Sequence, residues 1–378
     1  MGEDAVQAGR AKRSGGSRGA RSRDGSRGRT SAASGRGSRP WVDYFAWLRA
    51  VAAVSIVFMH AVVSTLKDAA PAVDDLVARA VGQAFMIPLT RWAVPVFFMI
   101  TGALLLDPEK DVGLDRIRRY VWRMVVVLLT FGLVFNVSGL MLQDGAGLPE
   151  ALGEGLRSLL FGSSWDHMWY VYALIGVYLF VPALRAFVRA ASRETYLLTL
   201  GAIYVLCFVV PTLNALLGLD LATLHVPEGA YPVGYVLLGY FAHRHLRLDW
   251  RIGLSGTACC VAATAIGAWA ELAGTSADYA FFPQGALVAP FALAVFLAFK
   301  RLLGDASVSE HPVVRGLDHL GFGLYVIHPV FVHAFVALVP TTFAPLWLYV
   351  LGCFLSSLAL GLAATWLVER VPWLGRFL

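Results

Sequence analysis

Long apolar runs, separated by short polar stretches, follow one another from residue 41 to the end of the chain. An α-helix needs about 20 apolar residues to cross the hydrocarbon core of a bilayer, and most of these runs have that length. The pattern therefore favours an all-α, polytopic integral membrane protein. The runs predict ten membrane-spanning helices, at residues 41–66, 85–106, 120–142, 167–188, 196–217, 231–241 with its flanks, 252–272, 282–300, 319–339 and 345–368.

Charged residues between the runs predict the orientation of the spans, because cytoplasmic loops of membrane proteins are rich in Lys and Arg. If the N-terminus lies in the cytoplasm, most Lys and Arg of residues 41–378 fall in cytoplasmic loops. Only Lys67, Arg79 and Arg157 then fall in the outer loops, the longest of which joins the third and fourth spans. We therefore expect both termini in the cytoplasm.

The first forty residues differ in composition from the rest. Of these, 26 are Gly, Ser, Lys or Arg, and such a segment cannot bury enough apolar surface to offset its ordering entropy. We predict a disordered, basic cytoplasmic tail over residues 1–40 and one membrane domain over residues 41–378. The net charge of +6 comes from this tail. A nucleic-acid enzyme carries its charge on the folded part, so no nucleic-acid partner is expected.

Composition and motifs exclude several classes of protein. Hydrophobic residues make up 58% of the chain and charged residues 15%, which excludes an ordinary cytosolic enzyme. The sequence has no P-loop, nucleophile elbow, H-E-x-x-H helix or dinucleotide-binding glycine loop. The four cysteines lie in apolar runs and form no C-x-x-C pair, so no metal site is predicted.

Two ionisable residues inside the first span are the strongest candidates for chemistry, because charged groups are costly in a membrane and often functional. Arg49 and His60 are eleven residues apart, which places them on one helix face with a rise of about 16 Å between them. An arginine at the cytoplasmic end suits a phosphate, and a deeper histidine can act as a base or nucleophile. Alternatively, the Arg49 side chain only extends to the membrane–water interface and follows the positive-inside rule, and His60 makes a structural contact between helices.

Other candidates lie near the ends and breaks of later spans. Arg91 begins the second span and precedes Pro95, which suggests either a polar site or a simple proline kink. Aromatic and ionisable residues at the outer end of the fourth span are typical of sugar binding or of an interfacial belt; these are Asp166, His167, Trp169 and Tyr170. His328 precedes Pro329 within the ninth span, where it has either a structural or a chemical role.

Four segments, in this order, resemble motifs of the acyltransferase type 3 family. Arg49 and His60 resemble the family's Arg-x10-His signature. Residues 94–102 resemble V-P-x-F-F-x-x-S-G, with Thr101 in place of the usual serine. Residues 168–176 resemble L-W-Y-L-Y-A-L-x-G, and residues 323–329 resemble G-I-Y-L-I-H-P.

The resemblance implies a membrane-bound O-acyltransferase of the bacterial inner membrane. Such proteins are thought to take acetyl from cytoplasmic acetyl-CoA and to deliver it to a hydroxyl of an extracytoplasmic or lipid-linked glycan. It implies that His60 is the essential histidine and that Arg49 is its partner. Arg49 and the cluster Arg116, Arg118 and Arg119 are the candidates for binding CoA phosphates, although ordinary positive-inside charge explains that cluster as well.

The remaining candidates are assigned to the acceptor, and they are Arg91, Asp166, His167, Trp169, Tyr170 and His328. A second interpretation is a non-enzymatic transporter or flippase of a glycan, lipid or small solute, since intramembrane Arg and His residues and interrupted helices also occur in carriers.

Overall fold

The structure is a computed structural model that describes residues 43–68, 76–162, 164–221, 226, 228–274, 282–304 and 307–378. All regular elements within these ranges are helical, which confirms the predicted all-α class. The predicted tail over residues 1–40 lies outside the described residues. The α-helices are α1 Asp43–Asp68, α2 Leu76–Thr90, α3 Ala93–Leu105, α4 Leu114–Val127, α5 Leu133–Gln143, α6 Leu148–Leu160, α7 Trp169–Ala190, α8 Arg193–Tyr204, α9 Val210–Leu217, α10 Tyr231–His245, α11 Trp250–Ala273, α12 Val288–Leu303, α13 Pro312–Leu338 and α14 Leu346–Val368.

Each of the ten predicted runs overlaps one or more of these helices. Within the described residues, eight helical segments are long and apolar enough to cross a membrane. The sixth and eighth runs correspond to α10 and α12, which are shorter helices of 15 and 16 residues. The chain is thus a multi-pass membrane protein.

The structure differs from the prediction in the second span and in the longest expected outer loop. The second span begins with α2, nine residues before the predicted start at residue 85, and it is interrupted at Arg91–Trp92. Pro95 causes this break, because its ring leaves no room for the carbonyl four residues earlier, that of Arg91. The amphipathic helix α6 occupies the stretch that we expected to be the longest outer loop.

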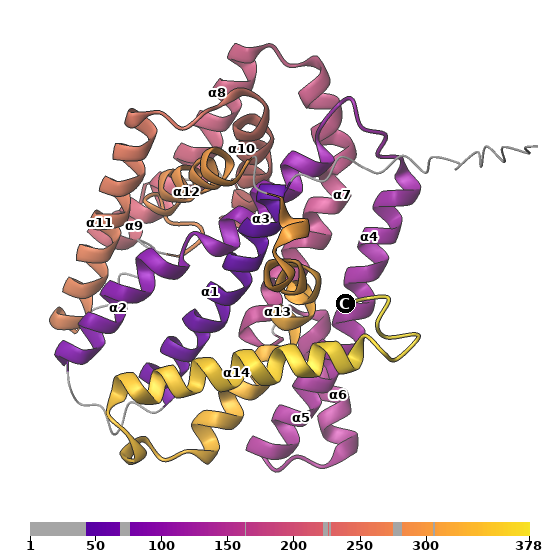
Figure 1. Ribbon diagram of the computed structural model, residues 1–378, viewed down its shortest axis with the longest axis vertical. Coiled ribbons are helices and arrows are strands. Elements are labelled where there is room, and N and C mark those ends of the chain that lie inside the picture. Colours follow the sequence, from indigo (N-terminus) through magenta and orange to yellow (C-terminus); the bar gives the residue numbers. More distant parts are fainter. Residues whose placement is uncertain are drawn as a thin grey trace, which may run out of the picture. The chain divides into compact units, whose positions relative to one another are not determined.

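α1 lies at the centre of the packing. It contacts α2, α3, α12, α13 and α14, and Figure 1 shows it between the α2–α11 pair on one edge and α4, α5 and α6 on the other. α3 and α10 cross in backbone contact at Gly102 and Gly239. A Cβ atom at Gly102 would lie 1.8 Å from the carbonyl oxygen of Val236, and one at Gly239 would lie 2.0 Å from that of Met99. Small residues allow this close approach of helices in membranes.

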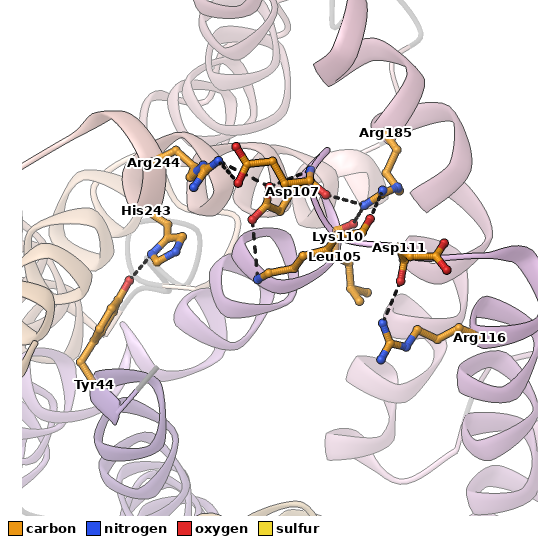
Figure 2. A network of polar contacts seen from close by, with 10 residues as sticks. Tyr44, Leu105, Asp107, Lys110, Asp111, Arg116, Arg185, His243 and Arg244 are labelled. Carbon is orange, nitrogen blue, oxygen red and sulfur yellow. Dashed lines mark hydrogen bonds and ion pairs between the residues drawn. The ribbon is translucent and has the colours of Figure 1, made fainter. Parts of the chain in front are cut away.

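Basic side chains hold several helix ends together on one side of the bundle (Figure 2). Arg185 near the end of α7 donates to three carbonyls at the last residue of α3 and in the loop that follows it. These are the carbonyls of Leu105, Asp107 and Lys110, at 2.5, 2.9 and 2.6 Å. Lys300 of α12 donates in the same way to the carbonyls of Ala242, His243 and Leu246 at the end of α10. Cations stabilise helix C-termini because the last carbonyls there lack partners within the helix.

Two further contacts join α1 and the loop after α3 to the end of α10. The Tyr44 hydroxyl lies 2.6 Å from Nδ1 of His243 (Figure 2), and Arg244 forms an ion pair of 2.9 Å with Glu109. The start of α1 and the ends of α3, α7, α10 and α12 therefore meet on one side, as alternating spans require. That this side is cytoplasmic stays a prediction.

Candidate active site

Two polar contacts join α1 to α13. The Arg49 guanidinium binds Asp318 in a bidentate pair, with Nε at 2.6 Å from Oδ1 and Nη2 at 3.1 Å from Oδ2. Further along both helices, Nδ1 of His60 lies 2.8 Å from Nε2 of His328. The earlier residue of α1 pairs with the earlier residue of α13, so the two helices run in the same direction.

Small residues between these contacts let α1 and α13 approach each other. A Cβ at Gly321 would lie 3.6 Å from the Cβ of Ala53, and both residues are buried. On its other side, α13 packs on α14, where a Cβ at Gly323 would lie 2.3 Å from the Thr365 methyl group. α13 is therefore fixed between two helices, and its polar side chains are held toward α1.

His167 joins His60 and His328 in a cluster of three imidazoles. Its ring centroid lies 6.4 Å from that of His60 and 6.0 Å from that of His328. Its Nε2 lies 3.1 Å from the Val326 carbonyl oxygen, and the Tyr325 hydroxyl donates to its backbone carbonyl. His167 and His328 are buried, whereas His60 is half-buried. His60 is thus the most accessible group of the three.

Arg91 lies in the turn between α2 and α3 and is buried, with 7% of its surface exposed. Its Nη1 lies 3.6 Å from Sδ of Met59, the residue before His60, and its Nη2 lies 3.9 Å from Sδ of Met86. The guanidinium also lies 5.1 Å from the centre of the Phe282 ring. The interruption of the second span therefore places a buried positive charge beside the histidine cluster.

The aromatic candidates at the start of α7 lie in different surroundings. Tyr170 is buried, with its ring centroid 4.9 Å from that of Phe98 and 5.3 Å from that of Tyr325. Trp169 is 37% exposed and packs against Tyr170 and Tyr231. The backbone of Asp166 forms part of a 3-10 turn, and its side chain lies outside the described part of the structure.

The arginine cluster lies at the start of α4, on the side where the helix ends meet. Arg116 donates to the carbonyl of Asp111 at 3.1 Å (Figure 2). Arg118 and Arg119 are exposed, and Arg118 approaches Asp115 only to 3.8 Å. Exposed ion pairs at this distance contribute little to stability. The charges remain accessible to an anionic molecule in the aqueous phase.

Asp318 was missed by the sequence reasoning. It lies one residue before the predicted start of the ninth span and ten residues before His328, so its spacing nearly matches that of Arg49 and His60. This similarity in spacing is the feature of the sequence that could have identified Asp318. In the described residues, no group of three or more His, Cys, Asp or Glu side chains is placed to hold a metal ion.

A family model described as an acyltransferase domain matches residues 41–366. The chain belongs to the acyltransferase type 3 family. No curated protein and no solved structure matches the chain. The matched range contains all four residues of the α1–α13 contacts and the whole of the histidine cluster. In this acyltransferase, His60 is the half-buried member of the histidine cluster.

Proposed function

We propose that this acyltransferase transfers an acetyl group from acetyl-CoA to a hydroxyl of a glycan, with His60 as the general base. The contact of 2.8 Å between His60 and His328 carries this proposal. It holds a half-buried imidazole within the membrane domain, in contact with a fully buried one. The match of an acyltransferase domain to residues 41–366 supports an enzyme over a transporter.

The protein has to supply only proton transfer and charge stabilisation, because the thioester of acetyl-CoA is already activated. His60 takes the proton of the acceptor hydroxyl while the oxygen attacks the thioester carbonyl. The carbon–sulfur bond then breaks, and the proton passes to the leaving thiolate. The buried guanidinium of Arg91, beside Met59, is suited to stabilise the negative charge that develops on the carbonyl oxygen.

The two substrates reach His60 from opposite ends of α1. Arg49 is held by Asp318 about 16 Å from His60 along the helix axis. The arginines at the start of α4 are candidates for the CoA phosphates, since guanidinium groups bind phosphate bidentately. Arg49 is a further candidate, and its Nε and Nη2 are engaged with Asp318. Arg91, Asp166, His167, Trp169 and Tyr170 are the candidates for binding the glycan, and the membrane is expected to be the bacterial inner membrane.

Inner-membrane vesicles incubated with radiolabelled acetyl-CoA and total lipid-linked glycans test this function. Wild-type protein is expected to label the glycan, and His60→Gln is expected to lower the rate by about 10²–10⁴-fold. His319→Gln is the matched control, because His319 lies on α13 with a side chain that is 73% exposed. The proposal fails if wild-type vesicles transfer no label, or if His60→Gln is as active as His319→Gln.

A further inference from the structure

Two hydrogen bonds link His60 to the backbone of α13 through the ring of His328. Nδ1 of His328 lies 2.9 Å from the carbonyl oxygen of Leu324, one helical turn earlier. Nε2 of the same ring lies 2.8 Å from Nδ1 of His60. Both nitrogens of His328 are thus in use, and its side chain is fully buried.

The chemistry of these atoms fixes where each proton lies. A carbonyl oxygen only accepts hydrogen bonds, so Nδ1 of His328 carries a proton and donates it to Leu324. A charged imidazole in the membrane interior is costly, and the His328 side chain is fully buried. His328 is therefore neutral, and its Nε2 presents a lone pair. Nδ1 of His60 must then be the donor in the contact between the two rings.

We infer that His328 is a positioning residue that holds His60 in one tautomer, with the proton on Nδ1 and the lone pair on Nε2. An unconstrained neutral imidazole carries its proton on either nitrogen, and the partner of one nitrogen decides the state of the other. With Nδ1 turned toward His328, Nε2 is the only atom of His60 able to accept a proton. The tautomer and the orientation of the ring are set by the same hydrogen bond.

The inference deepens the proposed function and rests on it, because it assigns the base of that reaction to a single atom. Nε2 of His60 accepts the hydroxyl proton and later returns it to the thiolate, so the ring is neutral again after each turnover. His328 transfers no proton at any step. It accepts the Nδ1–H bond of His60 throughout, and this bond strengthens while the His60 ring carries a positive charge.

A pair of substitutions at position 328 separates orientation of the base from mere filling of space. The amide of a glutamine reaches the region of Nε2, where its oxygen can accept from His60. The amide of an asparagine reaches only the region of Nδ1, near the Leu324 carbonyl. His328→Gln is therefore expected to keep at least about tenfold more kcat than His328→Asn, whose loss is expected to reach about 10²–10⁴-fold. KM for acetyl-CoA is expected to change little in both variants.

A second measurement does not depend on activity or on these variants. Nitrogen NMR of histidine-labelled wild-type protein in lipid nanodiscs reports which ring nitrogen of each histidine is protonated, and the loss of signals in His60→Gln assigns those of His60. We expect a protonated Nδ1 and an unprotonated Nε2. The opposite pattern, or equal kcat in His328→Gln and His328→Asn, overturns the inference. Failure of the wild type to transfer acetyl refutes the proposed function instead, and the NMR result still decides the tautomer.

Discussion

Alanine substitution at the crossing of α3 and α10 tests how the fold positions Arg91. A Cβ at Gly239 would lie 2.0 Å from the carbonyl oxygen of Met99, and a Cβ at Gly102 would lie 1.8 Å from that of Val236. Ordinary contacts between heavy atoms are about 3.5–4.0 Å. The two helices must therefore separate by at least about 1 Å, because backbone atoms cannot rotate away as side chains do. Overpacking of this kind typically costs about 1–3 kcal/mol, and we expect the upper end here.

The same displacement reaches the candidate active site. α3 begins two residues after Arg91, whose guanidinium contacts Met59 next to His60. A misplacement of about 1 Å can lower a catalytic rate by about 10²-fold. We therefore expect Gly239→Ala to lower both the thermal unfolding temperature in detergent and the rate of acetyl transfer.

Gly253→Ala in α11 is the matched control, because a Cβ there meets nothing within 4 Å. In an open helical position, alanine is favoured over glycine by about 0.5–1 kcal/mol. The control is expected to unfold at the wild-type temperature or slightly above it. Equal unfolding temperatures for Gly239→Ala and Gly253→Ala would show that α3 and α10 are not in backbone contact.

Three further substitutions or deletions address the site and the tail. Arg49→Lys is expected to raise KM for acetyl-CoA without loss of expression, because lysine keeps the charge but lacks the planar guanidinium fork that suits a phosphate. Wild-type kinetics at low acetyl-CoA would leave Arg49 as a charge that only sets the membrane topology. His60→Ala is expected to abolish transfer in a variant that still inserts and binds CoA, which a CoA-binding assay on purified protein checks. Deletion of residues 2–34 is expected to leave activity and insertion intact, since such a tail cannot pack, and loss of insertion would instead show that the tail sets orientation.

The fold was largely predictable because the length and hydrophobicity of a local segment indicate whether it can span a membrane. Ten apolar runs became helices, since backbone groups within a membrane must find their partners inside the segment. The shared face of Arg49 and His60 also followed from helical periodicity, and both side chains meet α13. These features depend on neighbours within one helix and need no knowledge of the rest of the chain.

What could not be predicted depends on contacts between distant segments. Asp318 is 269 residues from Arg49 in sequence, and His328 is 268 residues from His60, so no local pattern pairs them. α6 was missed for a different reason. Its leucines at every fourth position gave a helical signal that was too short for a span, and the structure leaves them exposed while Ala151, Gly155 and Leu159 are buried. That exposed row consists of Leu148, Leu152, Leu156 and Leu160.

The two contacts between α1 and α13 differ in charge, and the difference follows their burial. The ionic pair lies near the start of α1, where 27% of the Arg49 side chain is exposed and water can solvate the charge. The neutral pair lies about 16 Å further along the helix, where His328 is fully buried. A carboxylate in place of His328 would hold His60 equally well, but an acidic group at the centre of a membrane costs about 2.5–3.5 kcal/mol. A neutral imidazole orients the base without that cost, which favours a histidine over an aspartate facing His60 at this depth.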